Sequence, residues 1–400
     1  MRRNLEFSTR LTTAQWANHV LHDLKTVQKN TEPSENFAVG FGMGFRVMGV
    51  KAGFQPLDLT RLSRTYKSAT YRLIVLDWGG TLVAENDKSD KLTAYAVALG
   101  HATRAGPTQA LKESLETLCN DSRNTVFVIS GKDIDAVQDF FGDVRGLGLA
   151  AEHGVYYRWP RDEFYELGET VHHVKAKWHT VMDLGDQTWK EAAKGIMDIY
   201  VQRTHGTYIE QKGSALIWQF RDADPEFGFM QSKELEDHLK SVLPRDVVEV
   251  LRGGGVSDGY IEARRAGVSK GLFMRHALST MKSLGKEPDF VLGVGDDASD
   301  EPMFEEISKL HGSNPSQDNQ TAFGVAVGKK PTIAQSYVDD TSAVMDLLTT
   351  LNRTSLRDKR QFSALDLPLA AKENMAAFVQ STKDPKSPVR DSSYVIGCRL

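Results

Sequence analysis

The sequence has few cysteines and no long hydrophobic run. Its two cysteines, Cys119 and Cys398, exclude a disulfide framework and a cysteine-ligated zinc cluster, and they favour a reducing compartment. No apolar stretch approaches the ~18 residues that a membrane-spanning helix needs. No apolar segment follows the basic residues Arg2 and Arg3, as it would in a secretory signal. We therefore expect a cytoplasmic protein without a membrane segment.

The sequence also lacks an excess of charge of one sign. Its 49 Lys and Arg residues stand against 53 Asp and Glu residues, a net charge of −4. We therefore expect neither a nucleic acid nor an anionic membrane as a partner. A hydrophobic content of 40% and a charged content of 26% exclude a largely disordered chain. At ~150 residues per domain, 400 residues predict two or three domains.

Short apolar runs that end abruptly predict a central sheet. These runs lie at 73–76, 126–129, 290–292 and 322–327. Helical patterns such as 92–105 and 109–119 separate them, which is typical of parallel strands buried on both faces. The fold class is therefore α/β, with a mainly parallel sheet covered by helices. Since ligands bind outside the carboxyl ends of such strands, we expect Asp77, Ser130 and Asp296 at one site.

The chain between the second and third runs has a different pattern. Half-buried strands at 156–159, 208–210 and 215–220 alternate with helical stretches at 187–202 and 230–242. This pattern predicts a small inserted α+β domain, a candidate lid over the strand ends. The predicted domains are a core at 70–155 and 256–353, an inserted cap at 156–255, and a polar tail at 354–400. The last helix is expected at 342–352.

The first 69 residues form a separate segment in this scheme. Residues 12–27 predict one amphipathic helix, because Trp16, Val20 and Leu24 share a face that a neighbouring domain would have to cover. The glycine-rich segment 40–44 faintly resembles a nucleotide-binding loop. No clear helix follows it, so a loop packed closely against backbone is the preferred interpretation.

Asp77 is the candidate nucleophile. It ends a buried strand and precedes Gly79 and Gly80, so its carboxylate stands where backbone N–H groups can meet an anion. Attack by this carboxylate on a phosphoryl group would form an aspartyl phosphate and divide a difficult displacement into two easier steps. Alone, an Asp-x-Gly-Gly segment is also typical of an ordinary turn.

The acidic segment 295–301 supplies candidate metal ligands. Asp296, Asp297 and Asp300 crowd a predicted strand end, where they would repel one another unless a cation neutralises them. Mg2+ suits such a site, because it is held by one or two carboxylates, water and substrate phosphate. The alternative is an exposed acidic turn that begins a helix.

Two further residues complete the pattern. Ser130 could donate a hydrogen bond to a phosphate oxygen, or it could simply cap a helix. Lys270 could neutralise charge on a transferring phosphoryl group, or it could be a solvated lysine. The order Asp, Ser, Lys and Asp-Asp along the chain favours a magnesium-dependent phosphotransferase that forms an aspartyl phosphate.

With these residues assembled, the chain over about 70–350 resembles the trehalose-6-phosphate phosphatase family of the haloacid-dehalogenase superfamily. The resemblance extends to the segments 149–154, 210–212, 218–225 and 295–304. Residues 1–69 resemble the end of the trehalose-phosphate synthase module, and its linker, in two-module proteins. The resemblance therefore implies a fragment or truncated relative without synthase activity.

The family resemblance implies a Rossmann-like core with an inserted α+β cap, and a role for each matching residue. Asp77 would be the nucleophile and a Mg2+ ligand, while Ser130 and Lys270 would hold the phosphoryl group. The other metal ligands would be the Gly79 carbonyl and Asp296, supported by Asp297 and Asp300. The residues that would grip the disaccharide of trehalose 6-phosphate are Glu152, His153, Arg158, Glu210, Lys212 and Glu262.

One departure from the family pattern concerns catalysis directly. The family has a second aspartate, the general acid and base, two residues after the nucleophile, and this chain has Gly79 there. Such a group contributes typically 10²–10⁴-fold to a rate, so ligand binding could survive while turnover collapses. A second departure is Gln219, where the family usually has histidine.

Three functions remain open from the sequence. The first is hydrolysis of trehalose 6-phosphate to trehalose and phosphate, impaired at Gly79. The second is a regulatory or sugar-phosphate-binding module that partners a trehalose-phosphate synthase. The third is a different sugar-phosphate hydrolase on the same fold, which the Glu210 and Lys212 pair disfavours.

Overall fold

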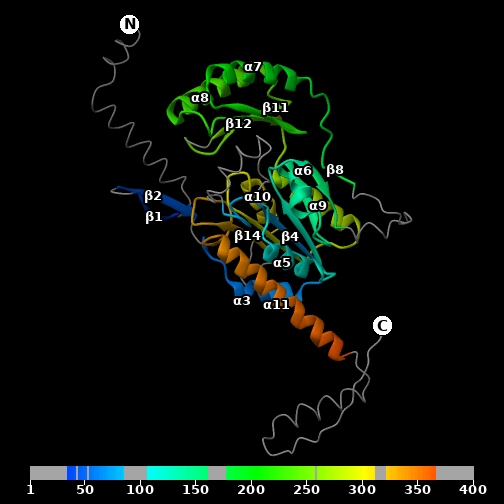
Figure 1. Cartoon of the computed structure of the whole chain (residues 1–400). Helices are drawn as coiled ribbons and strands as arrows, with labels where there is room; N and C mark the ends of the chain where they lie inside the picture. The colour runs from blue at the N-terminus through cyan, green and yellow to red at the C-terminus, as the bar shows by residue number, and fades with distance from the viewer. Residues whose placement is uncertain are drawn as a thin grey trace, which may run out of the picture.

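The computed structural model describes residues 34–41, 44–51, 54–84, 106–160, 177–256, 259–310 and 321–365 (Figure 1). The helix expected at 12–27 and the helical pattern at 92–105 lie outside these ranges. Across the described ranges, no helix combines the length and the apolar character needed to cross a membrane.

The central sheet has nine strands in the order β3-β15-β14-β13-β4-β5-β6-β7-β8. Their bounds are β3 Gln55–Pro56, β4 Arg72–Asp77, β5 Asn124–Ile129, β6 Gly148–Ala151, β7 Tyr156–Arg158, β8 His179–Thr180, β13 Phe290–Gly295, β14 Ala322–Val327 and β15 Ser336–Val338. The strands from β3 to β6 pair in parallel, whereas β7 and β8 pair antiparallel at one edge. The predicted mainly parallel sheet is confirmed.

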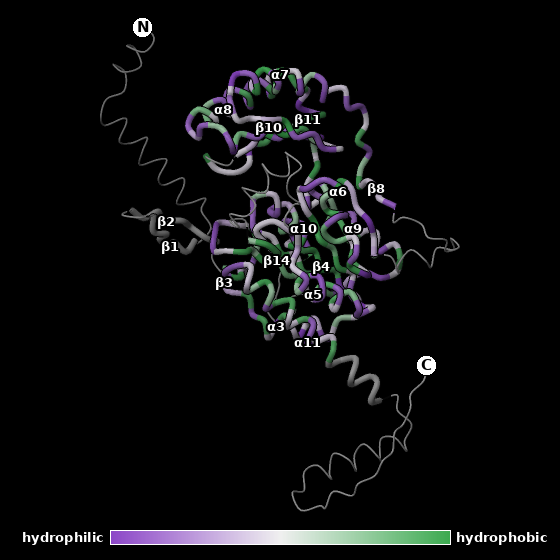
Figure 2. The backbone as a smooth tube through the Cα atoms, viewed as in Figure 1, coloured by the Kyte–Doolittle hydropathy of each residue, from purple (hydrophilic) through white to green (hydrophobic). Residues whose placement is uncertain are grey.

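Helices cover both faces of this sheet. They are α3 Leu59–Ser68, α5 Gln109–Cys119, α6 Ile134–Phe141 and α11 Thr341–Leu365 on one face, and α9 Lys270–Ser283 and α10 Glu301–Lys309 on the other. Alternate residues of β4 serve the two cores, with Ile74 in the first and Leu73 in the second. Two covered faces explain why the inner strands β4, β5, β13 and β14 are buried along their length and mainly apolar, and Figure 2 shows this hydrophobic interior.

A second, antiparallel sheet forms a separate layer that we call the small layer (residues 189–265). Its strands, in the order β11-β12-β10-β9, are β11 Val248–Gly253, β12 Tyr260–Arg265, β10 Ala215–Gln219 and β9 Tyr208–Gln211. Its helices are α7 Trp189–Arg203 and α8 Pro225–Val242. Both helices pack on one face of the sheet around Trp218 and Ile261. Figure 1 shows α7 and α8 on the outer side, away from the central sheet.

The ends of the chain differ from the sequence-based expectations. Part of the N-terminal segment joins the core, because β3 pairs with β15 and α3 packs in the first core cluster. β1 Ser34–Phe41 pairs antiparallel with β2 Gly44–Lys51, so Gly40 and Gly44 of the glycine-rich segment lie in paired strands, while residues 42–43 lie outside the described ranges. The last helix, α11, continues to Leu365 rather than ending at 352. Within this helix, Asn352 donates to the Ser114 carbonyl, and Ser355 bonds the Tyr66 hydroxyl at 2.6 Å.

Candidate active site

A cavity of about 280 Å³ lies between the two sheets. The central sheet contributes the carboxyl ends of β4, β5 and β13, including Asp77, Ser130 and Asp296. The small layer contributes Ile217 and Gln219, which alternate along β10 with residues that pack on α7 and α8. The small sheet therefore has one face for its own core and one face for the cavity.

Asp77, Lys270 and Asp300 form a buried ion-pair network. The Lys270 ammonium lies 2.8 Å from a carboxylate oxygen of Asp77 and 2.8 Å from one of Asp300, and all three residues are at most 4% exposed. Burial opposes the charge of Lys270, but the two carboxylates raise its pKa above the ordinary value. Burial raises the pKa of Asp77 to about 6, while Lys270 lowers it. Lys270 therefore stays charged, and it holds the pKa of Asp77 below the value that burial alone would give.

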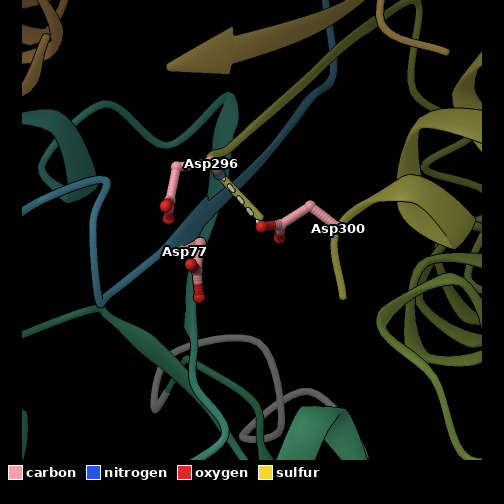
Figure 3. Close-up of side chains that lie close together, drawn as sticks. All are labelled: Asp77, Asp296 and Asp300. Atoms are coloured by element: carbon pink, nitrogen blue, oxygen red, sulfur yellow. Dashed lines mark hydrogen bonds between the residues drawn. The ribbon is translucent and has the colours of Figure 1, made fainter. Parts of the chain in front are cut away.

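Asp296 completes an acidic cluster with Asp77 and Asp300. Each of the three offers a carboxylate oxygen within 4.8 Å of the others (Figure 3). Asp300 uses one oxygen for Lys270 and the other for the backbone N–H groups of Asp296 and Asp297, at 3.0 and 3.1 Å. Asp300 thus holds the backbone of the loop at 296–297, whereas Asp77 and Asp296 line the cavity.

The cluster fits a hard divalent cation by its donor chemistry. The three carboxylates crowd around the buried Lys270, and Lys330 lies 3.8 Å from Asp296. Crowded carboxylates repel one another, and a bound cation would relieve that repulsion. Carboxylate and carbonyl oxygens are the ligands that Mg2+ prefers, and Gly79 also lines the cavity beside Asp77. Asp297 lines the cavity too, but its carboxylate accepts hydrogen bonds from Ser299.

Gly79 and Gly80, which follow Asp77, differ in their steric freedom. Gly80 has a φ of +73°, and a Cβ atom there would lie 2.2 Å from Asp296, so only glycine fits. A Cβ atom on Gly79 would meet none of the described atoms within 4 Å. Position 79 is exposed within the cavity. A side chain at position 79 would therefore enter open space beside Asp77.

Ser130 directly follows β5, and its hydroxyl group is able to donate a hydrogen bond. Its Oγ accepts a bond from the Lys132 backbone N–H at 3.1 Å, so the hydroxyl hydrogen stays available. Ser130 is 5% exposed and lines the cavity together with Lys132. Sequence reasoning missed Lys132, although the turn Ser-Gly-Lys after a strand end was a usable signal.

Four of the six residues expected to bind the sugar line the cavity: His153, Glu210, Lys212 and Glu262. Glu210 lies 3.6 Å from Lys212 and accepts a hydrogen bond from Gln219 at 3.1 Å. Burial lowers the pKa of His153, helped by the positive charge of Lys270, so its imidazole is neutral at pH 7. Burial raises the pKa of Glu262.

The other two expected sugar ligands, Glu152 and Arg158, do not line the cavity. The carboxylate of Glu152 accepts hydrogen bonds from the small layer, at Gly213 and Ser214. Arg158 is buried and donates to the side chain of Gln138 at 2.9 Å. Neither residue lines the cavity, because each side chain is hydrogen-bonded to another residue of the same chain instead.

Besides Lys132, the polar cavity residues Arg221, Tyr260 and Ser299 had no predicted role. Tyr260 stands two residues before Glu262 in β12, so the two-residue period of a strand could have placed it on the same face. Arg221 lies just after β10. With Lys212, it is a second positively charged side chain that the small layer contributes to the cavity. Burial raises the pKa of Tyr260 to about 12.

Comparisons with known proteins agree on one family. The family model described as trehalose-phosphatase matches residues 98–342. The UDP-forming alpha,alpha-trehalose-phosphate synthase 6 of Arabidopsis thaliana is 35% identical over 333 residues, or 83% of this chain and 35% of that protein. The trehalose-phosphatase of Schizosaccharomyces pombe is 32% identical over 289 residues, or 72% of this chain and 31% of that protein.

A solved structure extends the likeness to three dimensions. The C-terminal domain of Candida albicans trehalose-6-phosphate phosphatase has 26% sequence identity and a TM-score of 0.59, and the match covers 76% of this chain and 98% of that chain. Since the chain spans only 31% and 35% of the two curated relatives above, it corresponds to part of such proteins.

Proposed function

The chain belongs to the trehalose-phosphatase family, and from that premise we propose that it binds trehalose 6-phosphate and transfers the phosphoryl group to Asp77. The observation that carries this proposal is the meeting of Asp77, Lys270 and Asp296 in one cavity under the small layer. The small layer acts, in this proposal, as the cap that holds the disaccharide.

The residues of the cavity divide the work of phosphoryl transfer. A carboxylate oxygen of Asp77 attacks phosphorus as the bond between phosphorus and the sugar oxygen breaks, and solvent water protonates the departing sugar oxygen. A second water then attacks the aspartyl phosphate, which releases phosphate and restores Asp77. Lys270 and Ser130 hold the phosphoryl oxygens, as a cation and a hydroxyl donor respectively. Asp77, Asp296 and the Gly79 carbonyl would hold Mg2+, which neutralises phosphoryl charge when bound.

Turnover is slow in this proposal because position 79 carries no acid. No carboxylic acid at that position protonates the departing sugar oxygen or later takes a proton from the attacking water. Positioned acid–base groups contribute typically 10²–10⁴-fold, which corresponds to about 3–5 kcal/mol of barrier. The groups that hold the ligand are retained, so we expect the affinity for trehalose 6-phosphate to be preserved while the rate of hydrolysis is low.

The second candidate is a regulatory or sugar-phosphate-binding module that partners a trehalose-phosphate synthase. The glycine at position 79 favours it, as does the name of the longer Arabidopsis relative, a trehalose-phosphate synthase. Such a module would need the cavity residues for binding but not a general acid. A synthase partner would be recognised outside the cavity.

Phosphate release from trehalose 6-phosphate in the presence of Mg2+ tests the proposal. The wild type, Gly79→Asp and the nucleophile control Asp77→Asn are compared at equal concentration. We expect slow release by the wild type, at least tenfold faster release by Gly79→Asp, and none by Asp77→Asn. A wild type that binds the sugar phosphate but releases no phosphate would favour the regulatory module.

A further inference from the structure

We propose that Glu152 and Ser214 are positioning residues that latch the small layer onto the core. Their bonds fix the hairpin tip between β9 and β10 (residues 212–214), and thereby set where Glu210 and Lys212 stand over the cavity. The inference rests on the proposed function for its substrate, but it gives Glu152 a role other than sugar contact.

The carboxylate of Glu152 accepts hydrogen bonds from the hairpin tip. One oxygen accepts the Gly213 backbone N–H at 2.9 Å, and the other accepts the Ser214 backbone N–H at 2.7 Å. The Ser214 hydroxyl donates to the same carboxylate. Glu152 and Ser214 are each 3% exposed, so these charge-assisted bonds are made away from water, where losing one partner costs most.

The turn that carries Glu152 is held in an unfavourable backbone conformation. Glu152 and His153 have φ values of 49° and 59°, in the left-handed region that favours glycine. A non-glycine residue in this region is strained and persists only where surrounding contacts hold it. The turn sends the Glu152 side chain to the hairpin tip while His153 lines the cavity.

A second set of contacts ties the same tip to the phosphate end of the cavity. The Lys212 ammonium donates to the Gly131 carbonyl at 2.8 Å, next to Ser130. The Lys190 ammonium, from α7, donates to the carbonyls of Lys212 and Gly213 at 3.1 and 2.5 Å. The tip is therefore bonded from the core and from its own layer.

The turn at Glu152 and His153 is also joined through the backbone to residues 130–132, the loop that would hold the phosphate. The Glu152 N–H donates to the Lys132 carbonyl and the His153 N–H to the Ser130 carbonyl, each at 2.9 Å. Releasing the Glu152 latch should thus loosen the hairpin tip first and leave the phosphate-binding side chains of the core in place. The affinity for the sugar part of the ligand would fall, and the affinity for phosphate alone would not.

The test compares Glu152→Gln, Ser214→Ala and their double variant, with Ser214→Thr as the conservative rescue and exposed Ser241→Ala as the matched control. Two readouts apply: amide hydrogen exchange of segments 209–216 in the ligand-free protein, and calorimetric Kd values for trehalose 6-phosphate and for inorganic phosphate. Thermal unfolding reports whether each variant folds. If Glu152→Gln does not fold, Ser214→Ala decides alone.

We expect faster exchange at the tip in both latch variants and a loss of sugar-phosphate affinity of about tenfold, the effect of losing one charge-assisted bond. The double variant should be no worse than Glu152→Gln, Ser214→Thr should restore binding, and Kd for inorganic phosphate should stay within about twofold. Unchanged exchange and affinity in Ser214→Ala would overturn the latch, and an effect of Glu152→Gln alone would instead indicate direct sugar contact. If the wild type does not bind the sugar phosphate, the proposed function fails while exchange at the tip still decides the latch.

Discussion

The change Gly79→Asp tests whether the missing acid limits this protein. The structure admits the new side chain, because a Cβ atom at position 79 meets none of the described atoms within 4 Å. The φ of Gly79 lies outside the left-handed region, so aspartate adds no backbone strain there. The carboxyl group would stand in the cavity that holds Asp77 and Ser130.

The expected gain follows from the chemistry of the lost group. A positioned acid and base contributes typically 10²–10⁴-fold, and imperfect placement on this backbone reduces that gain, so we expect at least tenfold. Without a cation, a fourth carboxylate beside Asp77 and Asp296 should lower thermal stability, because like charges repel. Mg2+ should restore part of that stability.

The assay measures inorganic phosphate released from trehalose 6-phosphate under saturating substrate, with Asp77→Asn as the blank. Wild-type release at ordinary enzyme rates, ~1–10³ s⁻¹, would refute the argument that Gly79 impairs turnover. An active site that binds the ligand equally well but gains nothing from Gly79→Asp would refute it equally, since the acid would then not be the missing part.

Three further predictions concern stability and the metal. Burial raises the pKa of Asp121, but the bonds and charges of Arg123 and Arg72 outweigh it and lower that pKa to about 2 from 3.8. The ionised form therefore stabilises the fold above pH 4, and this contribution is lost as pH falls toward 2. Asp121→Asn should cost about 2 kcal/mol at pH 7 and clearly less at pH 2.5 in urea unfolding, and an equal cost at both pH values would contradict the pairing. Asp296→Asn should abolish the rise in Tm that Mg2+ gives the wild type, whereas an undiminished rise would place the ion elsewhere. Phe127→Ala, which removes a fully buried ring packed edge-on against two others, should cost about 3–5 kcal/mol, and a cost below about 1 kcal/mol would contradict the described packing.

The central sheet could be predicted because the apolar sequence of its inner strands indicates burial on both faces. The run 73–76 is apolar at every position, and the structure buries its even residues in one core cluster and its odd residues in the other. The cluster of Asp77 and Asp296 could be predicted for a related reason: each follows a strand, and parallel strands end at the same edge. Neither inference needed a contact between side chains.

The parts that sequence reasoning missed depend on contacts between distant residues. A glutamate in the segment 149–154 could bind a sugar or could bond another residue of the chain. Only the fold shows that Glu152 accepts a hydrogen bond from Ser214 at the tip of the hairpin between β9 and β10. The polar sequence from residue 354 onward indicated a tail, whereas Ser355 lies within α11 and bonds the Tyr66 hydroxyl. Local pattern cannot supply such partners.

The most direct test of the central claim is a calorimetric titration of trehalose 6-phosphate into the wild type with Mg2+ and with a chelator. We predict saturable binding with Mg2+ that weakens at least tenfold in the chelator, because the phosphate and the carboxylates of Asp77 and Asp296 would share the ion. Absence of binding under both conditions would contradict the account.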